Sequence, residues 1–464
     1  MRVTLSLTSA QHAAIHTHLF PGDGREAVAL MLCGRATSPG RAKLVVNEIV
    51  PVPYDACQRT DRRVTWPTSY LEPLLDKALR RGMAVAKIHS HPGGHLHFSK
   101  VDDEADAALF GSVHAWVDDS APHLSAVMVP SGAVLGRAHH ADGTHGELHH
   151  VCLVGDDIRF CRPPAGASRE IPEFARRHAQ AFGRGTFEAV RGLRLGVVGC
   201  SGTGGPLVDQ VARLGVGEIV LVDPDRVEEK NLNRIVNTTR ADIGRPKVEV
   251  LAAFVERLGL GSRVEAFPHD LSDPAALHAI STCDVVFGCM DGVEGRDLLN
   301  RLATFYGLAY FDVGVMLDAD GHGGIGQICG SVHYLQPGRS SLRGRGLYTD
   351  GMLEAESLRR QDPAAYEDRL ARGYIRGVPE DRPAVGALNG LFSSLAVMEF
   401  LLRLHPSRLD PNGGFATQTF SLTAGYWENL PDEGVDEALA RYVGRGDMVP
   451  FLNRPHLDML ARAA

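Results

Sequence analysis

The chain has 464 residues, which is enough for two or three domains with hydrophobic cores of their own. Hydrophobic residues make up 44% and charged residues 22%, as in ordinary globular proteins, and the formal net charge of −8 argues against a nucleic-acid partner. No apolar run approaches the roughly 20 residues of a membrane helix, the first residues lack a signal-peptide pattern, and the eight cysteines have no framework spacing, so we expect a cytoplasmic protein without a membrane partner.

The first 150 residues are predicted to form a mixed α+β domain. Short apolar runs alternate with segments of helical periodicity, in which leucines such as Leu71, Leu75 and Leu79 share one face. The expected strands are residues 27–33, 44–52, 85–88, 113–117 and 124–129, and the expected helices are residues 70–83 and 101–110. The following stretch, residues 139–169, is rich in His, Gly, Asp and Pro and is interpreted as a boundary.

A polar helix is expected at residues 172–182, and from residue 193 strands and helices alternate strictly. This alternation predicts a mostly parallel sheet with helices on both faces. The expected strands are residues 193–199, 218–223 and 284–289, and the expected helices are residues 204–214, 247–258, 296–306 and 390–404. A polar, Arg-rich stretch, Gly338 to Arg382, interrupts the alternation. The predicted organisation is a domain at 1–150, a linker with a helix at 151–184, an α/β domain at 185–440 and a tail at 441–464.

The sharpest chemical signal is His89-Ser90-His91, followed by Ser99 and Asp102. Two histidines at positions i and i+2 of a strand end point to the same side, and Asp102, near a helix start, can supply a third ligand. Three nitrogen and oxygen ligands leave the fourth position of a tetrahedral zinc ion to water, which is the arrangement of catalytic sites. Such a site needs a further carboxylate to move protons.

This pattern resembles the JAMM (MPN+) metalloprotease family, in which a distant Glu precedes His-x-His, seven residues, Ser, two residues and Asp. The resemblance implies a cytidine-deaminase-like α+β fold and zinc bound by His89, His91 and Asp102. It also implies that Glu26 acts as general base and acid and that Ser99 helps to hold the tetrahedral intermediate. Enzymes of this family cleave peptide or isopeptide bonds after a ubiquitin-like C-terminus. Glu48 is an alternative to Glu26, although its strand alternation suits a surface position; His95 and His97 are interpreted as loop residues.

A second signal is the glycine-rich turn GCSGTGG, which contains Gly199, Gly202 and Gly204 between a strand and a helix. Such a turn lets backbone N–H groups approach a phosphate at the helix N-terminus. The next strand ends in Asp223, about 20 residues on, where an acidic side chain reaches a ribose hydroxyl. These two features alone are shared by all Rossmann-like folds and are compatible with a dehydrogenase.

The residues that follow argue against a nicotinamide cofactor. The loop after Asp223 carries Asp225, Asn231 and Arg234, and the segment IGRPK places Lys247 at a helix start, so the available groups suit a triphosphate. Asp291 follows a strand at its carboxyl end, where ligands lie in open α/β sheets and where a carboxylate can hold Mg²⁺.

Together these blocks resemble the ThiF-type family of activating enzymes, over about residues 182–404. The resemblance implies a Rossmann-like doubly wound sheet that adenylates a protein C-terminus with ATP and Mg²⁺. It assigns Asp223 to the ribose and Asp291 to magnesium, and it assigns the triphosphate to Asn231, Arg234 and Lys247. Arg177 matches the family's upstream arginine, which acts across a homodimer.

The chain departs from that family in three places: Ser201 replaces the second loop glycine, Gly292 replaces a common Asn, and no cysteine follows Cys329. It therefore lacks the Cys-x-x-Cys zinc knuckle of many relatives and a catalytic cysteine between Gly338 and Arg382. Cysteines 200, 283 and 289 are interpreted as buried core residues. We expect the acyl-adenylate to pass directly to a partner's thiol, with the polar stretch serving as a mobile cover.

The two resemblances imply a bifunctional enzyme of a bacterial ubiquitin-like modification pathway, some of which are tied to phage defence. One half activates the ubiquitin-like protein, and the other trims its precursor or removes it from targets. The partners would be that protein and a conjugating enzyme. The alternative is activation of a sulfur-carrier protein, with a sulfur donor as the second partner. A third hypothesis is a non-catalytic scaffold that binds ubiquitin-like folds, against which the intact ligand sets argue.

Overall fold

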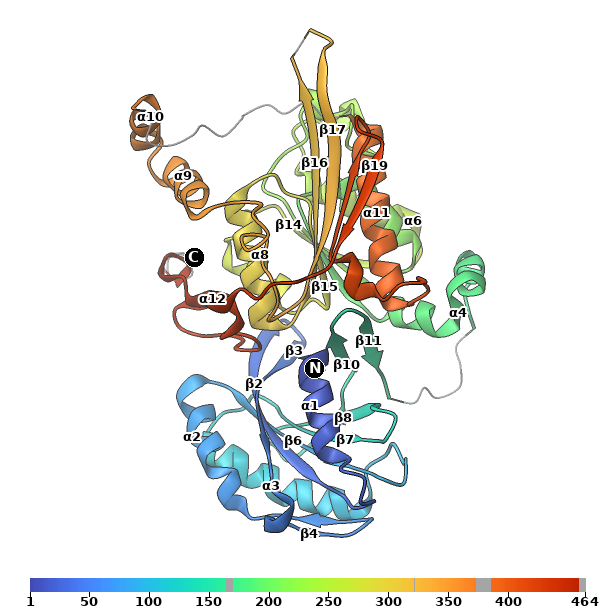
Figure 1. The fold of residues 1–464 in the computed structure, drawn as a ribbon, viewed down its shortest axis with the longest axis vertical. Helices are drawn as coiled ribbons and strands as arrows, with labels where there is room; N and C mark the ends of the chain where they lie inside the picture. Colours follow the sequence, from blue (N-terminus) through green and yellow to red (C-terminus); the bar gives the residue numbers. More distant parts are fainter. Residues whose placement is uncertain (164–169, 321, 373–384, 459–464) are drawn as a thin grey trace. The chain divides into compact units, whose positions relative to one another are not determined.

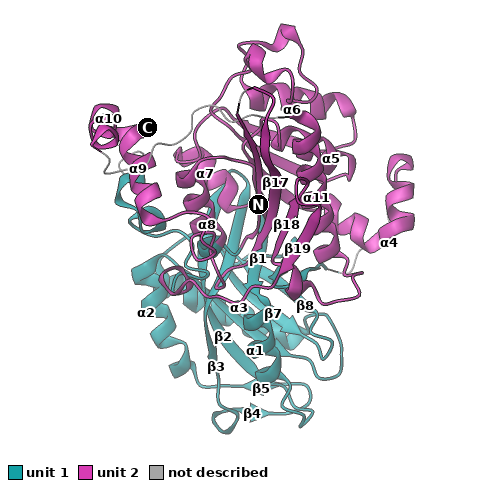
Figure 2. Cartoon of the chain, turned by 45° about the horizontal axis from the view of Figure 1, so that its top comes forward, with its two compact units in different colours: residues 1–169, 304–307, 441–463 teal, residues 170–303, 308–440, 464 magenta. Residues whose placement is uncertain are grey.

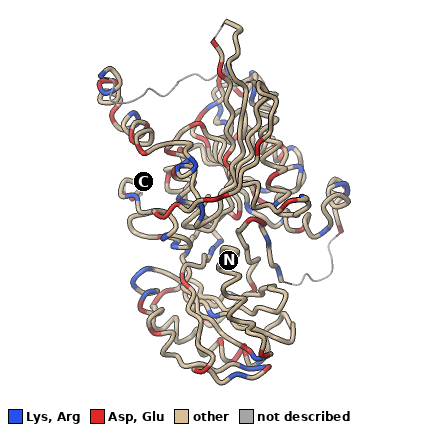
Figure 3. The backbone as a smooth tube through the Cα atoms, in the orientation of Figure 1, with Lys and Arg blue, Asp and Glu red and all other residues tan. Residues whose placement is uncertain are grey.

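The computed structural model describes residues 1–163, 170–320, 322–372 and 385–458. The chain divides into two compact units, shown in Figure 2. Unit 1 combines residues 1–169, 304–307 and 441–463, and unit 2 combines residues 170–303 and 308–440. Figure 3 shows that basic and acidic residues are interspersed along the tube in each unit.

Unit 1 contains a nine-stranded mixed sheet in the order β11-β10-β1-β3-β2-β6-β7-β8-β9. Helix α1 (Ser9–Leu19) shares a core with one face of this sheet, whereas α2 (Glu72–Arg81) and α3 (Lys100–Val117) share a core with the other face (Figure 1). The strands are β1 (Arg2–Thr8), β2 (Val28–Ser38), β3 (Arg41–Pro51), β6 (Ala84–Ser90), β7 (His123–Met128), β8 (Val134–His139), β9 (His145–Glu147), β10 (His150–Val154) and β11 (Ile158–Cys161). Two short strands, β4 (Gln58–Arg59) and β5 (Val64–Thr65), pair separately.

Two expectations for unit 1 differ from the structure. The strand expected at 113–117 is wrong, because these residues form the last turns of α3. Val113 and Val117, four residues apart, both face the core, and Asp118 ends the helix in a left-handed conformation at φ 52°. The domain boundary expected at residue 150 lies inside the sheet, because β10 pairs with β1 and carries β11 beside it.

Unit 2 contains an eight-stranded sheet in the order β14-β13-β12-β15-β16-β17-β18-β19, in which the strands from β14 to β16 are parallel and those after β16 antiparallel. The strands are β12 (Arg194–Val198), β13 (Glu218–Val222), β14 (Arg263–Phe267), β15 (Val285–Gly288), β16 (Ala309–Ala319), β17 (Ile325–Leu335), β18 (Thr417–Ser421) and β19 (Tyr426–Leu430). This arrangement confirms the predicted doubly wound sheet and adds the antiparallel half, for which the sequence patterns gave no expectation.

Helices cover both faces of this sheet, with α8 (Val293–Tyr306) and α11 (Gly386–Leu404) on opposite sides in Figure 1. The others in unit 2 are α4 (Arg176–Arg191), α5 (Gly204–Arg213), α6 (Lys247–Leu258), α7 (Pro274–Ser281), α9 (Asp350–Gln361), α10 (Pro363–Ala371) and the short α12 (Glu437–Ala440). Within the described part of the chain, α11 alone has the length and apolar composition of a membrane span. More than half of its most apolar window, 56%, is buried, and it packs on α5, β16 and β17 as a core helix does.

The segment expected as a tail belongs to unit 1. Its backbone joins β2 through Gly444 O, which accepts from Gly34 N at 3.1 Å, and Asp447 N, which donates to Arg35 O at 2.8 Å. The approach is so close that a Cβ atom on Gly444 would lie 2.0 Å from Val46 O. Residues 459–464 of the expected tail, residues 164–169 of the expected linker and residues 373–382 of the polar stretch lie outside the described residues.

Candidate functional site

The structure brings the three predicted metal ligands of unit 1 together. His89 Nε2 lies 3.1 Å from His91 Nε2 and 3.0 Å from Asp102 Oδ1, and His91 Nε2 lies 3.5 Å from Asp102 Oδ2. Ligands about 2.1 Å from a tetrahedral zinc ion are about 3.4 Å from one another, so these separations fit a zinc ion in the space that the three side chains share.

Local structure aims each of these side chains. His89 lies in β6, and His91, just past its end, donates its backbone N–H to Met128 O at 2.9 Å. His91 Nδ1 contacts His95 O at 2.9 Å, which leaves Nε2 for a metal. Asp102 is held by the capping box of α3, in which Ser99 N and Ser99 Oγ donate to Asp102 Oδ2 at 2.8 and 2.7 Å. Hydrogen bonding to the histidines and Ser99, despite burial, holds the pKa of Asp102 far below its ordinary value.

Glu26 is the fourth polar group at this centre. It is 5% exposed, and its Oε1 lies 4.0 Å from His91 Nε2. Its backbone is fixed on both sides, because Glu26 N donates to Thr60 O at 2.7 Å and Arg59 Nε donates to Glu26 O at 2.7 Å. Burial, with a smaller contribution from Asp102 and against the charge of His91, raises the pKa of Glu26 to about 7. A carboxyl group that titrates near neutral pH can both accept and return a proton.

The alternative carboxylate, Glu48, does not join this cluster. It forms an ion pair with Lys77 Nζ at 2.6 Å and is about one-third exposed. His95 and His97 are exposed, and of the two His95 contributes its carbonyl oxygen to His91.

An ion-pair network beside the ligands was not expected from the sequence. Asp106, on α3, is fully buried and pairs with Lys87 of β6 and with Arg137 NH2 of β8 at 2.7 Å. Arg137 NH1 also reaches Asp103 Oδ1 at 2.5 Å. The spacing was a usable signal, because Lys87 lies two strand residues before His89 and Asp106 one helical turn after Asp102.

A second group, formed by His114, Asp119 and His123, also has clustered donor atoms, but its chemistry does not fit a metal. Val85 N donates to His123 Nδ1 at 3.0 Å, so the neutral ring carries its hydrogen on Nε2, the atom that faces Asp119 Oδ1 at 3.6 Å. An Nε2 that carries hydrogen cannot ligate, and Asp119 is already paired with Arg35 at 3.2 Å.

In unit 2 the predicted glycine turn joins β12 to α5. Gly199 has φ +92°, and a Cβ atom there would lie 2.5 Å from Cys289 O. A Cβ atom on Gly204 would lie 1.8 Å from Gly199 O, so only glycine permits this tight turn. A Cβ atom on Gly202 would lie 2.1 Å from Asn389 Nδ2 and 3.0 Å from the Arg234 side chain, which places Arg234 beside the loop.

Asp223 is tied to the same turn. It is 5% exposed, and its carboxylate accepts from Cys200 N at 2.6 Å and from Asp225 N at 2.9 Å. Lys247 Nζ lies 2.7 Å from Asp225 Oδ2 and 4.0 Å from Asp223 Oδ1. Burial raises the pKa of Asp223, although the charge of Lys247 opposes the shift. The structure thus brings the glycine turn, both aspartates and Lys247 into one place.

The remaining predicted residues are more dispersed. Asn231 is buried and caps its own short turn, accepting from Glu228 N at 3.0 Å. Asp291 is exposed just after β15. Arg177 is exposed at the start of α4 and makes no hydrogen bond or ion pair with any residue described in the structure. The structure therefore does not bring Arg177 to the glycine turn of its own chain.

Helix α9 from the polar stretch contacts the N-terminus of α8, close to Asp291. Glu356 Oε2 accepts from Val293 N at 2.5 Å and from Glu294 N at 3.2 Å. Arg360 forms two further bonds with the Glu294 carboxylate, at 2.9 and 3.1 Å.

The cysteines show no sign of an activated thiol. Cys200 is fully buried, and burial raises its pKa well above the ordinary value. Burial also raises the pKa of Cys289 and Cys329. A nucleophilic cysteine requires the opposite shift.

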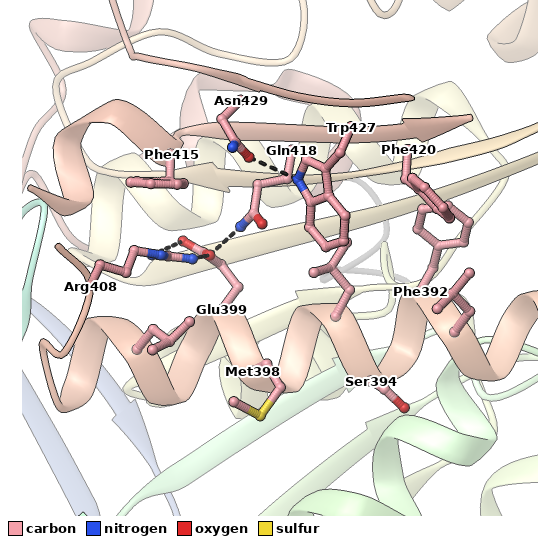
Figure 4. A pocket seen from close by; sticks show the side chains of 13 residues that line it. Phe392, Ser394, Met398, Glu399, Arg408, Phe415, Gln418, Phe420, Trp427 and Asn429 are labelled. Carbon is pink, nitrogen blue, oxygen red and sulfur yellow. Dashed lines mark hydrogen bonds and ion pairs between the residues drawn. The ribbon is translucent and has the colours of Figure 1, made fainter. Parts of the chain in front are cut away.

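A groove of about 430 Å³ lies between α11 and the β18–β19 hairpin (Figure 4). Phe392, Met398 and Trp427 contribute to its apolar lining, and Glu399 and Arg408, which pair with each other, also line it. None of the predicted site residues lines it.

Comparisons with known proteins match both halves of the chain. The family model described as "ThiF family" matches residues 175–423, and the model described as "Prokaryotic homologs of the JAB domain" matches residues 8–138. The chain is 38% identical over 115 residues to the SAMP-activating enzyme E1 of Haloferax volcanii, covering 25% of this chain and 43% of that protein. It is 40% identical over 111 residues to the adenylyltransferase and sulfurtransferase MOCS3 of Mus musculus, covering 24% of each.

A longer match, 27% identical over 206 residues, is to the ubiquitin-like modifier-activating enzyme 5 of Culex quinquefasciatus and covers 41% of this chain and 50% of that protein. The matched regions thus span half or less of these three relatives. Among solved structures, E. coli MccB with ATP is 17% identical with a TM-score of 0.43, covering 58% of this chain and 74% of that chain.

Proposed function

Because the chain belongs to the ThiF family and carries an N-terminal Prok-JAB domain, we propose that it is a bifunctional enzyme. Unit 2 adenylates the C-terminal glycine of a ubiquitin-like protein with ATP and Mg²⁺, and unit 1 is a zinc-dependent peptidase or isopeptidase for the same protein. The single observation that carries the proposal is the convergence of His89, His91 and Asp102 at separations that fit zinc, beside a buried Glu26.

The adenylating site uses groups already gathered around the glycine turn. The turn amides and the N-terminus of α5 receive phosphate oxygens, while Asp223 accepts a ribose hydroxyl. Lys247, Arg234 and Asn231 neutralise or bind the triphosphate, and Asp291 is the Mg²⁺ ligand. Asp225 holds Lys247 in place at 2.7 Å. Arg177 acts in the second active site of a homodimer, which agrees with its exposure on its own chain.

His89, His91 and Asp102 would hold a zinc ion in the peptidase site, which would polarise a water molecule and the scissile carbonyl. Glu26 accepts the proton of the attacking water and returns it to the leaving amine, for which a pKa of about 7 is suitable. Ser99 bonds to Asp102 in the absence of substrate, and its hydroxyl is the group available to the tetrahedral intermediate.

The peptidase proposal is tested with Glu26→Gln, with Glu48→Gln as the matched control. We expect Glu26→Gln to retain zinc by elemental analysis and to lose about 10²–10⁴-fold in cleavage of a ubiquitin-like precursor, because only the proton transfer is removed. The control should cleave normally. Loss of zinc from Glu26→Gln, or wild-type protein purified without zinc, would contradict the assignment.

The adenylation proposal is tested by ATP–pyrophosphate exchange with a candidate carrier protein. Arg234→Ala should lower exchange by about 10²-fold, because it removes a cation from the transferring phosphates. Lys230→Ala, which removes an exposed cation from the same loop, is the control. Equal effects of the two substitutions would refute the assigned role. Sedimentation that shows an active monomer would refute the homodimer.

We also propose that the enzyme forms no obligatory thioester and hands the acyl-adenylate to a thiol on a partner. The raised pKa values of the buried thiols and the lack of cysteine between residues 338 and 382 support this. The partner is a conjugating enzyme, or a sulfur donor if the carrier serves sulfur transfer. Because the MOCS3 relative is named an adenylyltransferase and sulfurtransferase, sulfur transfer is the second candidate pathway. Identifying what the carrier is joined to in cells separates the two.

A further inference from the structure

The metal-ligand pair His89–Asp102 is one of three successive contacts between β6 and α3. On the α3 side of β6 lie Val85, Lys87 and His89, each two residues apart. Val85 shares a core with Phe110 of α3, Lys87 pairs with Asp106, and His89 pairs with Asp102. From one contact to the next, the residue number in β6 therefore increases by two, while the residue number in α3, which runs antiparallel to β6, decreases by four.

These steps are matched in length. Two residues of a strand span about 6.6 Å, and four residues of a helix span about 6.0 Å. When one of these contacts between β6 and α3 is fixed, it therefore also fixes the position of α3 along its axis at the next contact. The Lys87–Asp106 pair is nearest to the ligands and is directional, because Asp106 binds Lys87 through Oδ1 and Arg137 through Oδ2.

Arg137 extends this support to the segment that leads into the helix. Its guanidinium group bonds to Asp103 and stacks on the Phe98 ring, with 3.9 Å between the guanidinium carbon and the ring centre. Its Nε donates to Ser125 Oγ at 3.2 Å, so Arg137 itself is held by β7. Phe98, just before Ser99, and Asp103, just after Asp102, are thus both attached to β8 through the Arg137 side chain.

We propose that Lys87, Asp106 and Arg137 are positioning residues for the peptidase, which set the distance between His89 and Asp102 and thereby the geometry of the bound metal. The inference rests on the proposed zinc site. This inference gives a function to the buried charges of Lys87, Asp106 and Arg137. Packing alone would not require charged side chains here, since the neighbouring contact between β6 and α3, Val85 with Phe110, is apolar.

The test replaces the directional pair with apolar side chains of similar size in the full-length protein, Lys87→Met with Asp106→Leu. Lys87 and Asp106 are removed together, so neither is left as an unpaired buried charge, and Arg137, which loses its bond to Asp106, keeps those to Asp103 and Ser125. We expect a melting temperature near that of the wild type but zinc affinity lowered about 10–100-fold, as for other groups that orient metal ligands. The visible absorption of the Co²⁺-substituted protein should also change, and kcat should fall more than KM rises.

The matched control is Lys77→Met with Glu48→Leu, which removes a strand–helix ion pair elsewhere in unit 1. Its zinc affinity and Co²⁺ spectrum should equal those of the wild type. If the Lys87/Asp106 double variant does not fold, Asp103→Asn loosens Arg137 at a half-exposed position and should lower zinc affinity about threefold or more.

Wild-type zinc affinity and an unchanged Co²⁺ spectrum in the double variant, or in Asp103→Asn where only that variant folds, would overturn the positioning role while leaving the zinc site intact. A wild-type protein that binds no zinc would overturn the proposed peptidase and this inference together.

Discussion

Burial sets the protonation of individual side chains in both units. Glu26 titrates near neutral pH chiefly because it is buried, whereas burial lowers the pKa of His333 in unit 2 to about 3, with Arg345 and Arg296 adding to the shift. His333 is 5% exposed, and its ring nitrogens contact Thr417 Oγ1 at 3.1 Å and Ser331 Oγ at 3.0 Å. It is therefore neutral in the folded protein at pH values where the unfolded chain protonates it.

This difference predicts a pH dependence of stability. A histidine whose pKa is lowered on folding binds fewer protons in the folded state than in the unfolded state. The free energy of unfolding therefore decreases as the pH falls from about 6.5, the pKa of the unfolded chain, to about 3, the pKa in the folded protein. Between these pH values, His333 should lower the free energy of unfolding by about 1.4 kcal/mol per pH unit. We expect His333→Gln to lower the slope of unfolding free energy against pH, measured by urea denaturation of each protein between pH 7 and pH 5. Identical slopes would show that His333 is not buried in its neutral form.

At the scale of elements, α9 caps α8 from outside. The first amides of a helix lack partners within it, and here Glu356 supplies the acceptor that a capping side chain would normally provide. The polar stretch expected to be a mobile cover therefore contains at least one anchored helix in the described residues. Its composition did not indicate this, because the contact depends on a carboxylate 63 residues from the amide that it binds.

We expect Glu356→Ala to release α9. Loss of the cap should cost about 1 kcal/mol, so amide hydrogen exchange in residues 350–361 should rise about fivefold. Glu354→Ala, on an exposed position of the same helix, is the control and should exchange like the wild type. Unchanged protection in Glu356→Ala would mean that other contacts hold the helix.

Local sequence patterns predicted most of the elements near the sites, and their failures have a physical cause. The run VHAWV at 113–117 has the β-branched and aromatic residues typical of a strand, yet its valines also have the i, i+4 spacing of a buried helix face. A short apolar run is compatible with both the alternation of a strand and the spacing of a helix. Here packing against β6 decides in favour of the helix. The clustering of His89, His91 and Asp102 was predictable because these residues are close in sequence. Arg137 could not be predicted because it reaches Asp103 and Asp106 from a separate strand, whereas Lys87 and Asp106 follow the spacing of His89 and Asp102 and were within reach of prediction.

At the scale of the whole molecule, the chain returns to unit 1 after it has built unit 2. The returning segment depends on glycine, since Gly444 has φ +68° and its Cα faces Val46 O. Asn47 Nδ2 adds a bond to Val443 O at 2.7 Å. Unit 1 therefore includes backbone contacts from both early and late parts of the chain.

We expect Gly444→Ala to destabilise unit 1 by about 2–4 kcal/mol, from backbone strain plus a clash with Val46 O. Gly40→Ala is the matched control, because Gly40 lies in unit 1 and has a similar φ of +74° but no atom within 4 Å of the added methyl group; it should cost only about 1 kcal/mol. Denaturant unfolding, followed by release of the zinc ion proposed for His89, His91 and Asp102, reports on unit 1. Equal losses in the two variants would contradict a close approach at Gly444.

The return of the chain to unit 1 has a consequence for biosynthesis. On the ribosome, residues 1–169 emerge before the segment that bonds to Gly34 and Arg35 has been translated. Unit 1 therefore cannot complete the backbone contacts of its β2 strand until the segment that follows unit 2 has been translated. A message that is truncated after unit 2 but before residue 444 yields a chain in which unit 1, and not unit 2, is left incomplete.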